Sequence, residues 1–140
     1  MQAIPRTLFV IEDNRTEGML LQLALSDIEG LVVRVFPTAT AMLAATEKPD
    51  IVIVDIHLPD MNGLDLIPLI YAIDPNIRIV AVSAQPEIDV VAKVQAQGVY
   101  NYLVKSESCL TYLHHIIGDL IIVLDHYDQK NGQVPNNPIV

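Results

Sequence analysis

Short runs of aliphatic and aromatic residues alternate with longer segments of helical periodicity along this chain. The runs have the composition of strands that are buried on both faces of a sheet. They occupy residues 8–11, 31–36, 51–54, 77–82 and 100–104. Apolar residues recur at helical spacing over residues 16–26, 38–47, 64–73, 86–97 and 108–127. This strand–helix alternation predicts an α/β domain in which helices cover both faces of a parallel sheet.

Proline and glycine mark several of the expected boundaries. Pro86 suits the first position of the fourth helix and Gly98 its end. Pro68 falls inside the third helix and should either occupy its first turn or bend it. We expect the domain to cover residues 6–127, because residues 128–140 have the Asn-, Gln- and Pro-rich composition of a linker or tail.

Four of the strand-like runs end at residues that are suited to phosphate chemistry. These residues are Glu12 and Asp13 after the first run, Asp55 after the third, Ser83 after the fourth and Lys105 after the fifth. In an open parallel sheet, ligands bind beyond the carboxyl ends of the strands. We therefore expect three carboxylates, a hydroxyl and an ammonium to meet at one edge. Any one of them alone would suit a solvated loop, so their conjunction carries the prediction.

The charge of this predicted cluster favours a divalent cation. Three carboxylates at close range repel one another unless a cation or a proton intervenes. With Lys105 and a divalent ion, the formal charge of the cluster sums to zero. An oxygen-only site with open positions suits Mg²⁺. A carboxylate such as Asp55 can also act as a nucleophile and form an aspartyl phosphate.

Composition narrows the setting of this chemistry. The chain has 140 residues, 51% of them hydrophobic, a net charge of −9 and a single cysteine, Cys109. The cysteine count excludes an internal disulfide and suits a reducing compartment. Apolar runs fall short of the roughly 20 residues that span a bilayer, and residues 1–6 lack a secretory apolar region. We expect a cytoplasmic protein with no membrane segment, and the net charge argues against direct nucleic-acid binding.

The ordered set of residues resembles the receiver (CheY-like) domain of two-component response regulators. The resemblance covers about residues 6–127. It rests on Glu12-Asp13, on Asp55 with Pro59 four and Gly63 eight residues later, on Ser83, and on Tyr102 to Lys105. It implies a flavodoxin-like, doubly wound sheet of five parallel strands in the order 2-1-3-4-5 with five helices.

The resemblance also implies a role for each acidic position. Asp55 would accept a phosphoryl group from a phosphohistidine on a sensor histidine kinase or a histidine phosphotransfer protein. Asp13 would bind Mg²⁺ directly and Glu12 through water. Asp55 and the backbone carbonyl of His57 would complete the protein ligands.

Three further residues would convert phosphorylation into a signal. The resemblance implies that Lys105 pairs with the phosphoryl oxygens, that Ser83 moves to hydrogen-bond the phosphoryl group, and that Tyr102 turns inward. The face formed by helix 86–97, strand 100–104 and helix 108–127 would then change.

Ser106 departs from the family's commoner pattern, and His57 leads to a separate hypothesis. Ser106 replaces the proline that usually follows the lysine, so the loop holds either a strained cis peptide or a trans path. His57 is most simply a loop imidazole whose backbone carbonyl serves regardless of its side chain. The alternative hypothesis is that His57 and Gln85 flank the pocket mouth and set the rate at which water attacks the phosphoaspartate.

The last expected helix has more apolar surface than packing on the sheet requires. One stripe of suitable core residues comprises Leu110, Leu113, Ile117, Ile121 and Leu124. A second comprises Tyr112, Ile116, Leu120, Val123 and Tyr127. A surface helix normally shows one such stripe. The second stripe is either part of a well-covered core helix or a contact with another domain or a second copy, which would make a homodimer.

Two other functions compete with the phosphoacceptor switch. A Mg²⁺-dependent phosphohydrolase with an aspartyl nucleophile usually has a second acid two residues later for proton transfer, and here that position is His57. A degenerate receiver that serves only as an interaction scaffold would not need the acids, Ser83 and Lys105. We expect a phosphoacceptor rather than an enzyme, with at most weak self-catalysed phosphorylation and dephosphorylation.

Overall fold

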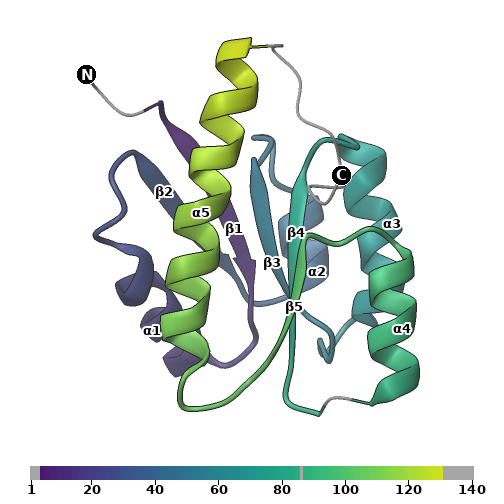
Figure 1. Cartoon of the computed structure of the whole chain (residues 1–140). Helices are drawn as coiled ribbons and strands as arrows, with labels where there is room; N and C mark the ends of the chain where they lie inside the picture. The colour runs from purple at the N-terminus through teal and green to yellow at the C-terminus, as the bar shows by residue number, and fades with distance from the viewer. Residues whose placement is uncertain (1–3, 86, 131–140) are drawn as a thin grey trace.

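The computed structural model describes residues 4–85 and 87–130, and these form five strands and five helices around one sheet (Figure 1). The strands are β1 (Arg6–Ile11), β2 (Leu31–Phe36), β3 (Ile51–Asp55), β4 (Arg78–Ser83) and β5 (Asn101–Val104). The helices are α1 (Arg15–Leu25), α2 (Ala39–Leu43), α3 (Gly63–Ile73), α4 (Ile88–Ala96) and α5 (Cys109–Lys130).

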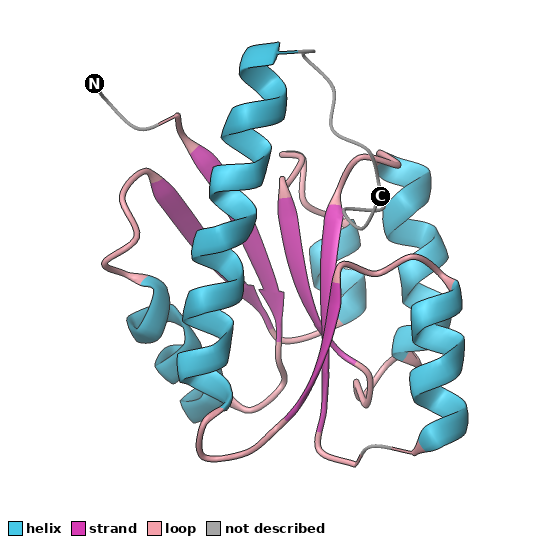
Figure 2. Ribbon diagram, viewed as in Figure 1, coloured by secondary structure: helices cyan, strands magenta, loops and turns pink. Residues whose placement is uncertain are grey.

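All neighbouring strands are parallel, and their order is β2-β1-β3-β4-β5, so the predicted doubly wound fold is confirmed. Helices α1 and α5 cover one face of the sheet, and α2, α3 and α4 cover the other (Figure 2). Alternate residues of the central strands point into the two layers. On β3, for example, Val52 and Val54 belong to one apolar cluster, whereas Ile51 and Ile53 belong to the other. Burial on both faces explains why these strands appear as continuous apolar runs.

Helix α2 is shorter than its alanine-rich sequence indicated. It ends at Leu43, not near residue 47, and the Thr38 side chain accepts a hydrogen bond from Ala41 N–H at its start. Its buried residues, Ala39 and Met42, both lie within this short segment. Residues 44, 46 and 47 are exposed, so packing adds little to the helix propensity of the segment after Leu43.

Gly98 ends α4 as expected, whereas Pro68 lies beyond the first turn of α3. Pro68 lies inside α3, where residue 68 cannot donate a hydrogen bond to the Leu64 carbonyl. Gln97 Nε2, from the end of α4, donates to that carbonyl instead at 3.2 Å. Gly98 follows α4 with a positive φ of 81°. The fourth helix begins at Ile88, two residues later than expected, and Pro86 lies outside the described residues.

Helix α5 continues to Lys130, beyond the boundary expected at residue 127. The buried Arg6 side chain explains this extension, because it forms ion pairs with Asp125 and Asp128, three residues apart on one face of the helix. The expected tail is therefore helical at 128–130, and its residues 131–140 lie outside the described part of the chain. Among the described residues, no helix is both long and apolar enough to cross a membrane.

The two apolar stripes expected on α5 are not separate surfaces. Leu120 was assigned to the outer stripe, but it is fully buried in the core. Ile116 and Tyr127 are partly buried against the same core, and Tyr112 is exposed. For Leu120 the stripe is therefore part of a well-covered core helix, which was one of the two readings expected, and not a contact surface.

Candidate functional site

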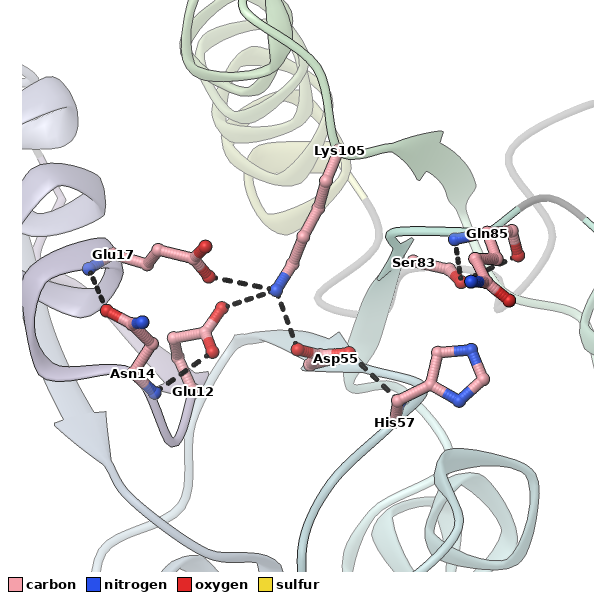
Figure 3. A network of polar contacts seen from close by, with 8 residues as sticks. All are labelled: Glu12, Asn14, Glu17, Asp55, His57, Ser83, Gln85 and Lys105. Atoms are coloured by element: carbon pink, nitrogen blue, oxygen red, sulfur yellow. Dashed lines mark hydrogen bonds and ion pairs between the residues drawn. The ribbon is translucent and has the colours of Figure 1, made fainter.

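The carboxyl ends of the strands bring four of the predicted residues together, of which Figure 3 shows Glu12, Asp55 and Lys105. Asp55 ends β3 with 4% of its surface exposed, and Glu12 follows β1 with 3% exposed. The Lys105 ammonium follows β5 and donates to Asp55 Oδ2 at 2.7 Å and to Glu12 Oε1 at 2.8 Å. Carboxylate oxygens of Glu12, Asp13 and Asp55 lie within 4.8 Å of one another. The predicted acidic edge is therefore present in the fold.

The donor set fits a hard divalent cation. It consists of carboxylate oxygens from two buried residues and from the exposed Asp13, and oxygen ligands of this kind are those that Mg²⁺ takes. The second oxygen of Asp55 accepts the backbone N–H of His57 at 2.9 Å. This bond holds the loop after β3 close to the carboxylate, which places the His57 backbone beside the acidic group.

Burial and the single ammonium set the protonation of this edge. Burial raises the pKa of Glu12 to about 7, although its hydrogen bond to Lys105 opposes the shift. Burial would lower the pKa of Lys105, but hydrogen bonds to three carboxylates outweigh it and raise that pKa. The hydrogen bond from Lys105 lowers the pKa of Glu17. Lys105 is thus cationic, and its hydrogen bonds favour the ionised forms of Glu12 and Glu17.

Ser83 lies at the same edge but is bonded to its own loop. Its hydroxyl donates to the Gln85 carbonyl at 3.0 Å and accepts the Gln85 N–H at 3.2 Å. Ser83 is fully buried. Figure 3 shows Ser83 and Gln85 on one side of Asp55 and Glu12 on the other. The structure therefore places Ser83 near the acids without joining it to their ion pairs.

The loop after β5 takes the trans path. All peptide bonds in the described residues are trans, that between Lys105 and Ser106 included. The Lys105 backbone N–H donates to the Ser83 carbonyl at 2.8 Å. The Ser106 backbone carbonyl accepts the Cys109 N–H at 3.1 Å at the start of α5. Lys105 thus reaches the acids although serine stands where the family usually has proline.

Comparison with known sequences and structures identifies the family. The family described as the response regulator receiver domain matches residues 8–116. The chain belongs to the response regulator receiver family. Receiver domains are phosphoacceptors that interact with histidine kinases or phosphotransfer proteins and bind Mg²⁺ at an acidic pocket.

Two relatives and one solved structure illustrate the likeness. The chain is 37% identical to the DNA-binding transcriptional regulator NtrC of Azospirillum brasilense over 101 residues, which are 71% of this chain and 21% of that protein. It is 43% identical to the chemotaxis protein CheY of Thermotoga maritima over 58 residues, 41% of this chain and 48% of that protein. A CheY-like receiver domain from Methanospirillum hungatei superimposes with a TM-score of 0.78 at 20% identity, covering 91% of this chain and 99% of that one. The chain thus spans about a fifth of its NtrC relatives.

The glycine eight residues after Asp55 has a steric cause. Gly63 begins α3, and its N–H donates to the Ile56 carbonyl at 2.9 Å. A Cβ at this position would lie 2.7 Å from Ile56 Cα, closer than atoms can pack. Asn62 caps α3 by accepting the Leu64 N–H at 2.8 Å. The glycine therefore lets α3 pack directly on the residue that follows Asp55.

One site residue of this receiver was missed at the sequence level. Glu17 of α1 accepts a hydrogen bond from Lys105 at 3.0 Å and so joins the acidic edge. A capping pattern was visible, since Asn14 caps α1 and Glu17 stands three residues later. That pattern predicts a local contact and gives no sign of Lys105, which is 88 residues away.

Tyr102 was expected to turn inward when the receiver is phosphorylated. It lies on β5, and its ring packs partly buried against the apolar cluster under α3 and α4. Its hydroxyl is buried without a hydrogen-bond partner among the described residues. Since the hydroxyl makes no hydrogen bond within the described part of the chain, no polar contact through it holds the side chain in this position. Leaving a buried hydroxyl unsatisfied also costs stability.

Proposed function

We propose that Asp55 of this receiver accepts a phosphoryl group from a phosphohistidine on a sensor histidine kinase or a histidine phosphotransfer protein. The observation that carries the proposal is the 2.7 Å contact between Lys105 Nζ and Asp55 Oδ2 beside the acidic group. An Asp55 oxygen bonds to phosphorus while the P–N bond breaks. The imidazole leaves with the bonding electron pair, as the neutral ring when its other nitrogen carries a proton.

The charge change on Asp55 defines what the surrounding residues must do. Phosphorylation replaces one negative charge by about two. Lys105 would pair with the phosphoryl oxygens, since an ammonium can donate up to three hydrogen bonds. Glu12 through water, Asp13, Asp55 and the His57 backbone carbonyl would hold Mg²⁺. When bound, the ion would neutralise negative charge on the phosphoryl oxygens.

Ser83 and Tyr102 would carry the signal to the α4–β5–α5 face. At present the Ser83 hydroxyl donates to the Gln85 carbonyl and accepts the Gln85 N–H. To reach the phosphoryl group, Ser83 would have to give up its hydrogen bond to the Gln85 carbonyl. Tyr102 would then occupy the space that Ser83 leaves. The coupling is a local hydrogen-bond exchange that biases a two-state element.

The exposed apolar residues of this face support a homodimer or a contact with another domain. Ile88 is 84% exposed, Tyr112 56% and Val104 40%. Sedimentation equilibrium with and without beryllofluoride, an acyl-phosphate mimic, tests the homodimer. We expect association to strengthen with the mimic, and a monomer under both conditions would contradict it.

The proposal also covers the setting of the chain. The single cysteine supports a cytoplasmic location, and the net charge of −9 argues against direct nucleic-acid contacts by this chain.

Intact-protein mass spectrometry after incubation with acetyl phosphate and Mg²⁺ tests the phosphoacceptor role. We expect wild type to gain one phosphoryl group and Asp55→Asn to gain none. Asp119→Asn is the matched control, because Asp119 is exposed on α5 outside the acidic group. Continuous turnover of organic phosphates would favour the phosphohydrolase, and a chain that gains no phosphoryl group would be a binding scaffold.

The hypothesis about His57 and Gln85 is tested by the lifetime of the phosphorylated form. In Figure 3 the His57 ring lies on the Gln85 side of Asp55. We expect His57→Ala to change the rate of phosphoryl loss, whereas His115→Ala, an exposed histidine on α5, leaves it unchanged. Equal decay of wild type and His57→Ala would refute this role.

A further inference from the structure

Lys105 has a third partner that is not part of the phosphorylation site proposed above. An ammonium has three N–H donors, and one carboxylate accepts each of them. Glu12 and Asp55 are two of these partners, and Glu17 Oε2 is the third at 3.0 Å. Incoming phosphoryl oxygens can therefore bind Lys105 only if one of these partners is displaced.

Glu17 is the partner that leaves most easily. Its side chain is 48% exposed, against 2% for Glu12 and 6% for Asp55, and its contact with Lys105 is the longest of the three. A water-exposed carboxylate regains solvation when it is released, whereas a buried one is left uncompensated.

A second partner for Glu17 is already in place at the start of α1. Asn14 caps this helix, and its side chain accepts the Glu17 N–H at 3.0 Å. A glutamate at this third helical position commonly reaches back to the N–H of the capping residue. Here Glu12 Oε2 accepts the Asn14 N–H at 3.2 Å instead (Figure 3). The Glu17 carboxylate is thus diverted from its usual local partner to Lys105.

We propose that Glu17 is a positioning residue that holds Lys105 before phosphorylation and yields it to the phosphoryl group, turning back to the Asn14 N–H. The exchange rests on the phosphoacceptor role proposed for Asp55. It leaves both donors satisfied, because Lys105 replaces one acceptor by another and the Asn14 N–H passes from Glu12 Oε2 to Glu17. Glu17 thereby sets how readily Lys105 becomes available.

Two variants separate the contact from the charge. Glu17→Gln keeps the length of the side chain and its capping ability but removes the charge. Glu17→Asp keeps the charge but shortens the side chain by one methylene, so it no longer reaches Lys105. Glu29→Gln removes a charge from the exposed turn after α1 and serves as the control. The measurement is the rate at which acetyl phosphate modifies Asp55 at saturating Mg²⁺, followed by intact mass.

We expect both Glu17 variants to react about two- to five-fold faster than wild type, the range that a partly exposed ion pair supports. Glu29→Gln should react at the wild-type rate. Unchanged rates in both Glu17 variants would overturn the proposal while leaving Asp55 as the phosphoacceptor. Acceleration in Glu17→Gln alone would overturn it too, in favour of a general charge effect. If wild type gains no phosphoryl group, the phosphoacceptor role fails, and this inference falls with it.

Discussion

Replacing Gly63 by alanine should disturb the proposed phosphorylation site through the backbone. The added Cβ would lie 2.7 Å from Ile56 Cα and 3.0 Å from Ile56 Cδ1. Because the nearer atom is backbone, it cannot rotate aside, and either α3 or the loop that follows Asp55 must move. Overpacking of this kind costs about 1–3 kcal/mol. We therefore expect the free energy of unfolding of Gly63→Ala to fall by about 2 kcal/mol.

Urea denaturation followed by circular dichroism measures this loss. With a slope of about 2 kcal/mol per molar urea, a 2 kcal/mol loss lowers the midpoint by about 1 M. Because Ile56 directly follows Asp55, acetyl phosphate should also modify the variant more slowly than wild type. The expected displacement of the loop links the two measurements.

Gly118→Ala supplies a control of opposite sign. Gly118 lies within α5, and apart from its chain neighbours and the adjacent helix backbone no atom of the described residues is within 4 Å of the position that its Cβ would occupy. Alanine in a helix interior is favoured over glycine by about 0.5–1 kcal/mol, so this variant should be more stable than wild type. A Gly63→Ala protein with the stability and phosphorylation rate of wild type would refute the steric reasoning.

Three further substitutions test buried or paired polar groups. Arg78 is 1% exposed, none of its side-chain nitrogens has a hydrogen-bond partner among the described residues, and burial lowers its pKa. Arg78→Met should therefore raise the free energy of unfolding by about 1–3 kcal/mol. Arg78→Lys keeps the charge and should not raise it. Tyr102→Phe removes a buried, unpartnered hydroxyl and should raise the thermal midpoint in the absence of phosphate donors. The hydrogen bond from Lys48 lowers the pKa of Asp74 below its ordinary 3.8, so Asp74→Asn should cause a small loss of stability at neutral pH. This deficit should disappear as the pH falls through the lowered pKa, because wild-type Asp74 then loses its charge in the folded state too.

The fold and the edge of the sheet were predictable because each depends on short-range patterns. Strands buried on both faces require continuous apolar runs, and a parallel arrangement brings all their carboxyl ends together. Once the alternation of strands and helices was recognised, the positions of Glu12, Asp55 and Lys105 at one edge followed without any knowledge of tertiary contacts. The observed bonds of Lys105 agree with that reasoning.

What could not be predicted depends on contacts between distant segments. The end of α2 at Leu43 depends on the exposure of most residues that follow it, and the extension of α5 depends on an arginine on β1 that pairs with Asp125 and Asp128. Leu120 looked like a surface residue because helical spacing shows that residues share a face but not how deeply that face is buried. The trans peptide before Ser106 likewise follows from the path of a loop.

Glu17 also changes the charge balance on which the expectation of a divalent cation was based. Three carboxylates, Lys105 and a divalent ion sum to zero, but the fourth carboxylate leaves one negative charge in excess. Phosphorylation of Asp55 adds about one more. Turning Glu17 toward the Asn14 N–H keeps its charge at the start of α1, where the helix dipole favours an anion, and frees one Lys105 N–H for the phosphoryl group. The exchange proposed for Glu17 would therefore make the Lys105 ammonium available at the step that adds negative charge to Asp55.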